Sequence, residues 1–109
     1  MSFSGQLYTH GIWTVKSGSE SAFISLWAGF ANWTARTQPG LVSSAVLLQD
    51  RDDPQRFVSF GPWDDEASIK AWRGMPEFTA FFAKAKELCE DTQMRTLRLA
   101  AKAEKGAER

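Results

Sequence analysis

Apolar and polar residues follow two different periods along this chain. Short stretches rich in β-branched and aromatic residues predict strands over residues 7–16, 41–49, 56–61 and 93–100. Apolar residues spaced at helical intervals predict helices over about residues 20–36 and 65–90. The resulting order, βαββαβ, predicts an α+β, ferredoxin-like domain with an antiparallel sheet whose helices cover one face.

The ends of the two predicted helices carry capping signals. Ser17 with Glu20 fits a capping box for the first helix, although Ser19 is an alternative cap. Asp64 is the expected N-cap of the second helix, and the acidic residues after it suit the helix dipole. Because Pro76 has no N–H to donate, we expect the second helix to kink or restart just before it.

Two of the predicted strands are apolar on both faces. In the first of these strands, one side carries Leu41, Ala45 and Leu47, and the other carries Val42, Val46 and Leu48. In the next strand, Val58 and Phe60 oppose Phe57. A sheet with helices on one face and water on the other would alternate more cleanly between apolar and polar residues. We therefore predict that a second copy of the chain covers the helix-free face in a two-fold homodimer.

Length and charge limit the possible architecture and partners. The chain has 109 residues, which suits one domain, predicted over residues 1–100, with a flexible charged tail over residues 101–109. The formal net charge is zero, so we expect no nucleic-acid partner, because binding a phosphate backbone needs a basic surface. Apolar runs fall well short of the roughly 20 residues of a membrane span, so no membrane association is expected.

A single cysteine, Cys89, rules out a disulfide within the chain and fits a cytoplasmic protein. The helical pattern around Cys89 predicts a buried thiol on a helix. The first residues, MSFSGQ, lack a basic segment followed by an apolar run, so no signal peptide is expected. The contiguous carboxylates of residues 64–66 diverge on a helix and predict a solvated helix end rather than a metal site.

Three stretches together carry a resemblance to a known family. These are Pro39-Gly40-Leu41, RFVSFGPW at residues 56–63 and DDEASIKAWRGMPEF at residues 64–78. Over about residues 8–100 the chain resembles the antibiotic biosynthesis monooxygenase family. The resemblance implies a dimeric α+β barrel with a ligand cavity between helices and sheet in each subunit. It also implies oxidation of aromatic polyketides or quinols without metal or flavin, so no cofactor is expected. Relatives with this fold bind and degrade haem.

The chain departs from the family pattern at several polar positions. Many members have Glu where this chain has Gly61, His where it has Trp72, and a second His near Glu77. The haem-degrading branch has an iron-binding histidine at the place of Phe82. Without that imidazole, iron lacks an axial ligand on this helix, and haem binding is the less favoured interpretation.

The resemblance and the periodicity together suggest candidate site residues. His10, the only histidine, is the candidate catalytic group, either as a general base or hydrogen-bond partner, or else as a rim residue without function. Candidate substrate contacts are Phe23 and Trp27 on the first helix and Trp72 and Phe82 on the second. Because the second helix is interrupted, we predict a mainly apolar cavity near Trp72, although Trp72 alone would also fit ordinary core packing.

Three function classes were compared on these residues. RNA-recognition motifs share the element order, but Asp53, Pro54 and Gln55 replace their basic, glycine and aromatic positions. A non-catalytic dimer that binds a small hydrophobic molecule is the stronger alternative. The favoured prediction is a cofactor-independent monooxygenase that acts on a small phenol or quinol held in an apolar pocket, with the substrate supplying the electrons for O₂.

Overall fold

A computed structural model of the chain describes residues 6–106, so the expectations about a signal peptide and about the end of the tail fall partly outside the described residues. The elements are β1 (Leu7–Val15), α1 (Glu20–Thr37), β2 (Val46–Gln49), β3 (Arg56–Trp63), α2 (Glu66–Arg73), α3 (Pro76–Leu88) and β4 (Cys89–Arg98). The strands form one antiparallel sheet in the order β2-β3-β1-β4. The predicted ferredoxin-like fold is confirmed, with the second helix in two pieces. Within residues 6–106, no helix has both the length and the apolar content that crossing a bilayer requires.

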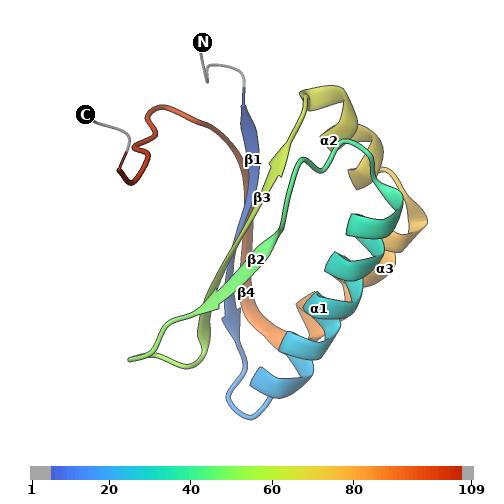
Figure 1. Ribbon diagram of the computed structural model, residues 1–109. Coiled ribbons are helices and arrows are strands. Elements are labelled where there is room, and N and C mark those ends of the chain that lie inside the picture. The colour runs from blue at the N-terminus through green and yellow to red at the C-terminus, as the bar shows by residue number, and fades with distance from the viewer. Residues whose placement is uncertain (1–5, 107–109) are drawn as a thin grey trace.

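All three helices lie on one face of the sheet, and the other face carries no helix (Figure 1). Strand alternation explains which side chains face the helices. On β1 the buried positions are Thr9, Gly11, Trp13 and Val15, and on β3 they include Phe57, Ser59, Gly61 and Trp63. The side chains between them belong to the helix-free face.

The break predicted in the second helix is confirmed. α2 ends at Arg73, and α3 begins with Pro76 in its first turn, where a missing N–H costs no hydrogen bond. The N-cap of α2 is Asp65 rather than Asp64. The Asp65 side chain accepts a hydrogen bond from the Ser68 backbone N–H at 2.9 Å, and this bond lowers the pKa of Asp65. Asp65 therefore takes the N-cap role predicted for Asp64, because β3 extends through Trp63 and the helix starts one residue later.

The capping box predicted for α1 is not formed. Ser19 occupies the N-cap position, but its side chain makes no capping hydrogen bond. The Glu20 carboxylate instead accepts from the Gly18 backbone N–H at 2.8 Å. Gly18 has a φ of 92°, so the turn after β1 needs a residue that tolerates the left-handed region.

Two predicted strand starts were wrong. β4 begins at Cys89 rather than at residue 93, so this cysteine starts a strand instead of continuing a helix. Its thiol is buried, as predicted, and burial raises its pKa to about 11. β2 begins at Val46 rather than at residue 41. Leu41 forms only an isolated bridge, to Trp63, and the regular ladder does not include the residues between Leu41 and Val46.

The core consists of two aromatic clusters between helices and sheet. The larger cluster contains Trp13, Val15, Phe23, Phe57, Phe81, Ala85 and Cys89. The α2 cluster contains Trp63, Ile69 and Trp72. Phe30 of α1 packs against both clusters, stacking on Phe81 with 4.4 Å between ring centroids and on Trp72 with 5.6 Å. Burial of large rings therefore stabilises both ends of the interior.

The two-sided apolar pattern is present as predicted. Leu41, Ala45 and Leu47 are partly buried toward α1, whereas Val42, Val46 and Leu48 are exposed. On the helix-free face, Leu48 is 53% and Leu97 37% exposed, far more than a core side chain. Coverage of this face by a second copy stays a prediction.

Candidate functional site

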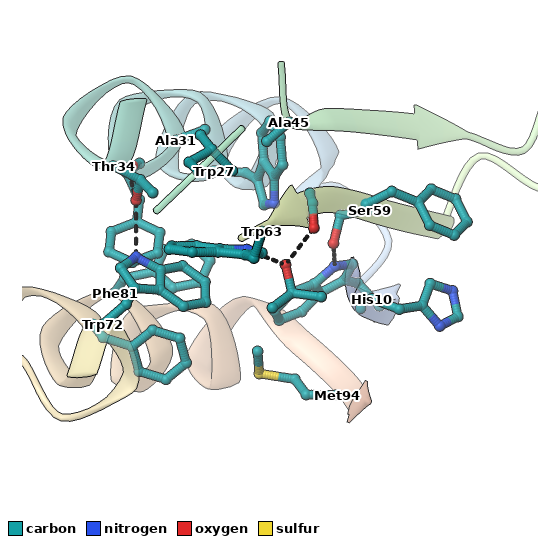
Figure 2. A pocket seen from close by; sticks show the side chains of 18 residues that line it. His10, Trp27, Ala31, Thr34, Ala45, Ser59, Trp63, Trp72, Phe81 and Met94 are labelled. Atoms are coloured by element: carbon teal, nitrogen blue, oxygen red, sulfur yellow. Dashed lines mark hydrogen bonds between the residues drawn. The ribbon is translucent and has the colours of Figure 1, made fainter. Parts of the chain in front are cut away.

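A mainly apolar cavity of about 50 Å³ lies between the sheet and the helices, beside Trp72 (Figure 2). Phe60 of β3 contributes one ring to its lining, and the other aromatic walls are Trp13, Trp27, Phe30, Trp63, Trp72, Phe78 and Phe81. These rings come from both core clusters and from α1, so the cavity occupies the junction between them. The predicted location near Trp72 is confirmed.

Three buried indole N–H groups in this cavity are each paired with a hydroxyl from another element. The pairs are Trp13 Nε1 to Ser59 Oγ, Trp63 Nε1 to Thr9 Oγ1 and Trp72 Nε1 to Thr34 Oγ1, each at 3.1 Å. Dashed lines in Figure 2 mark these bonds. Each bond satisfies a donor that would be costly to bury alone, and it fixes the plane of a large ring.

The three hydroxyls differ in whether their own proton is free to donate a hydrogen bond to a ligand. Thr9 donates its own proton to the Gly61 carbonyl at 3.3 Å, and Thr34 donates to the Phe30 carbonyl at 2.9 Å. Ser59 has no acceptor for its proton among residues 6–106. Because a hydroxyl can donate and accept at once, Ser59 retains one donor at the cavity wall.

Gly11 leaves room for the Ser59 pair. A Cβ atom at Gly11 would lie 2.6 Å from Trp13 Nε1 and 2.7 Å from Ser59 Oγ, closer than real contacts allow. Glycine on β1 therefore permits an indole and a hydroxyl to meet beside the adjacent strand. The pair is a built feature of the site and not a chance contact.

His10 is the only ionisable residue among the described residues that line the cavity. Its ring points away from the cavity (Figure 2) and stacks on Phe60, its neighbour on β3, at 4.8 Å and 20°. Its Nδ1 is buried and has no hydrogen-bond partner within residues 6–106. This orientation follows from strand alternation, since Thr9 and Gly11 face the helices. A catalytic role for His10 stays a prediction, and the direction of its ring weighs against it.

The four predicted aromatic contacts divide into two groups. Trp27 and Trp72 line the cavity, and Trp72 is also core, with 7% of its surface exposed. Phe23 and Phe82 do not line it. Phe23 is fully buried in the larger cluster, and Phe82 stacks on Phe78 at 6.1 Å. Helical spacing shows which side chains share the inner face of a helix. It does not show which turns of the helix border a cavity.

Sequence reasoning missed the polar members of the site. Thr9, Ser59 and Trp63 are not among the candidate residues that the sequence predicts, and all three line the cavity. Strand alternation could have identified them. Thr9 and Ser59 are polar, but the residues two positions before and after each of them are apolar or glycine. Both hydroxyls therefore lie on the strand face that points to the core.

The cavity is smaller than the predicted ligand requires. An apolar cavity of about 150 Å³ holds a benzene molecule. At about 50 Å³, the cavity beside Trp72 is too small for an aromatic ring in this conformation. The cavity in this conformation therefore does not provide the volume that the predicted phenol or quinol substrate requires.

Other chemistry is sparse in the described part of the chain. Within residues 6–106, no group of three or more His, Cys, Asp or Glu side chains is arranged to hold a metal ion. Cys89 is 6% exposed, and with a pKa of about 11 its thiol stays protonated at neutral pH, which makes it a poor nucleophile.

The strand order and the three helices on one sheet face define a ferredoxin-like α+β domain with a cavity between helices and sheet. A sequence model of the family described as antibiotic biosynthesis monooxygenase matches residues 8–84, and the chain belongs to this family. The resemblance inferred from the sequence is confirmed. A search among curated proteins finds no match.

Solved structures with the same fold cover nearly the whole chain. SnoaB from Streptomyces nogalater, a cofactor-independent oxygenase, is 23% identical with a TM-score of 0.80, over 90% of this chain and 96% of that chain. A putative antibiotic biosynthesis monooxygenase from Deinococcus radiodurans is 17% identical with a TM-score of 0.79, over 90% and 96%. One from Bacteroides thetaiotaomicron is 10% identical with a TM-score of 0.74, over 89% and 90%. At these identities the likeness concerns the fold.

Proposed function

We propose that this protein is a cofactor-independent monooxygenase that oxidises a small, electron-rich phenol or quinol in the cavity beside Trp72. Membership of the monooxygenase family supports an oxygenase-type function. The observation that carries the substrate class is the lining of this cavity, which combines aromatic walls with a single uncommitted hydroxyl donor on Ser59. Because a volume of about 50 Å³ is smaller than an aromatic ring, the proposal requires a wall residue to move when the substrate binds. Flat apolar walls suit an aromatic ring, and the donor suits a phenolic oxygen.

In this proposal the substrate supplies all the electrons. The phenol loses its proton to water at the cavity mouth, and the Ser59 hydroxyl donates a hydrogen bond to the phenolate oxygen. The phenolate gives one electron to O₂, and the resulting radical pair forms a C–O bond at a ring carbon that bears hydrogen. The peroxide anion takes one proton back from water and becomes a hydroperoxide. Loss of water leaves a quinone, so one oxygen atom enters the product and the other becomes water. The protein contributes orientation and exclusion of bulk water.

The balance can be written for 1-naphthol. One molecule of 1-naphthol and one of O₂ give 1,4-naphthoquinone and water. An oxygen electrode with a panel of phenols and quinols, run with and without chelator, tests the activity. Chelator-insensitive, protein-dependent oxygen uptake supports the proposal. Tight binding of the same compounds without oxygen uptake would instead favour a non-catalytic binder of small hydrophobic ligands.

We also propose that the protein is a homodimer paired through the helix-free face. The support is the exposure of Val46, Leu48 and Leu97, which together with half-buried Ile12 and Phe60 make this face apolar. Large contiguous apolar surfaces on soluble proteins mark interaction sites. In such a dimer the helices and the groove beside each cavity would stay outside the interface, so each subunit would keep its own site.

Haem binding is the weaker candidate. Phe82 stands at the expected ligand position, and the imidazole of His10, the one histidine, stacks on Phe60 and points away from the cavity (Figure 2). Titration with haemin should therefore give no sharp, stoichiometric Soret change.

A further inference from the structure

A groove of about 230 Å³ lies outside the cavity, between α1 and the segment that precedes β2. Its lining is mostly small, and it includes Trp27, Ala28, Ala31, Ala35, Ser44 and Ala45. Small side chains on both sides leave a slot between a helix and an edge strand. The groove lies on the helix side of the sheet, next to the cavity.

Three residues belong to both the groove and the cavity: Trp27, Ala31 and Ala45. Figure 2 shows the Trp27 side chain next to Ala31 and Ala45, which come from α1 and from the segment before β2. Since both alanines are small, the Trp27 indole is the largest side chain shared by the groove and the cavity.

Trp27 differs from the other tryptophans of the cavity in how it is held. The indoles of Trp13, Trp63 and Trp72 are each fixed by a hydrogen bond to a hydroxyl. The indole N–H of Trp27 has no such partner among residues 6–106, and its ring is half-buried. Rotating this side chain therefore breaks no hydrogen bond, whereas rotating any of the others would break one.

The opposite side of this wall is a bulged edge segment. Val42 donates its backbone N–H to the Pro62 carbonyl at 3.0 Å, and regular β2–β3 pairing resumes where Val46 faces Phe60. Residues 43–45 therefore oppose Gly61 alone, outside the regular ladder. Such bulges leave backbone groups unpaired and occur at sheet edges and next to active sites. The segment can move outward without loss of ladder hydrogen bonds.

We propose that Trp27 is a gate through which ligands pass from the outer groove into the cavity, with residues 43–45 as the yielding side of the opening. Rotation of the indole joins the groove and the cavity into one larger space, which removes the mismatch between the present volume of the cavity and an aromatic ring. This inference rests on the proposed function for the identity of the ligand, but not for the gate.

Anaerobic stopped-flow fluorescence with 1-naphthol tests the gate without any turnover. A gate raises the barrier equally in both directions, because it limits passage and not the bound state. Trp27→Ala should therefore accelerate association by about tenfold or more, and dissociation by at least as much. Because Trp27 also lines the cavity, the loss of its contact adds to the dissociation rate, so the faster association is the result that identifies a gate. Trp27→Phe should give an intermediate acceleration, and it keeps the test valid if the alanine variant fails to fold.

Trp33→Ala is the matched control, because Trp33 lies on the same helix but lines neither the groove nor the cavity. It should leave both rate constants near their wild-type values. The proposal is overturned if Trp27→Ala changes only the dissociation rate, if neither rate changes, or if no variant binds 1-naphthol. Binding that is gated by Trp27 without any oxygen uptake would refute the proposed oxygenase activity and leave the gate intact. Oxygen uptake together with binding rates that do not change in Trp27→Ala would support the oxygenase activity and refute the gate.

Discussion

Trp13 on β1 donates its indole N–H to the hydroxyl of Ser59 on β3 at 3.1 Å, inside the aromatic interior. The bond satisfies the indole and leaves the serine proton without an acceptor among residues 6–106. Ser59 therefore has two roles: it satisfies a buried indole of the core, and it offers a hydrogen-bond donor at the cavity wall. The first role concerns stability and the second concerns activity, so substitutions can separate them.

Ser59→Ala should destabilise the protein by about 1–3 kcal/mol, because the buried Trp13 N–H loses its partner. In the proposed reaction it should also lower kcat/KM by about tenfold or more, since the donor to the phenolate is removed. Thr34→Val is the matched control: it deprives Trp72 of its partner, but the Thr34 proton already bonds the Phe30 carbonyl. Urea unfolding should show similar losses for both, and only Ser59→Ala should impair turnover of stable protein.

His10→Gln should leave the pH profile of kcat unchanged. The imidazole stacks on Phe60 and points away from the cavity, so the profile should follow ionisation of the substrate. Profiles measured with two phenols of different acidity provide the check, and they should shift with the phenol in both proteins. A basic limb that is lost in His10→Gln would restore His10 as the catalytic base.

Cys89 should make the protein less stable in alkali. Burial raises the pKa of its thiol to about 11 from an ordinary value of 9.0, so the folded state holds the proton more tightly than the unfolded state. The contribution is fully present below pH 9.0 and is lost as the pH rises toward 11. Thermal unfolding should therefore show a decline in Tm over this range. The decline should be shallower in Cys89→Ala, and an equal slope in both proteins would contradict the assignment.

The dimer proposal predicts a specific disrupting substitution. Light scattering of the wild-type protein should give about twice the chain mass of 12.2 kDa. Leu48→Glu places a charge on the helix-free face, where Leu48 is 53% exposed, and should yield the monomer. Ile24→Glu is the control, because Ile24 is 41% exposed on α1, away from that face. A wild-type monomer would rule out the two-subunit barrel.

Much of the fold follows from periodicity, and the errors have local physical causes. The element order, the break before Pro76 and the two apolar faces of the strands at residues 41–49 and 56–61 were predictable from spacing alone. The strand starts at residues 46 and 89 were not. In β2, apolar alternation continues through a bulge that lacks ladder pairing, and periodicity does not register hydrogen bonds. At Cys89 the chain passes from α3 directly into β4, with no turn residue to mark the change.

The candidate site was only partly predictable. Trp27 and Trp72 were found because large rings recur on the inner helix faces. His10 was chosen as the only histidine, and the strand register then turned its ring to the other face. Thr9 and Ser59 escaped notice because isolated hydroxyls carry little chemical signal until their partners are known. Those partners, Trp63 and Trp13, lie on other strands, so only the three-dimensional pairing identifies them.

Incubation of the purified, chelator-treated protein with 1-naphthol under ¹⁸O₂ tests the central claim most directly. Mass spectrometry of the product should show 1,4-naphthoquinone with a single ¹⁸O atom, formed in proportion to protein, with the second labelled atom in water. Unlabelled quinone, hydrogen peroxide in place of labelled water, or binding without product would contradict a cofactor-independent monooxygenase.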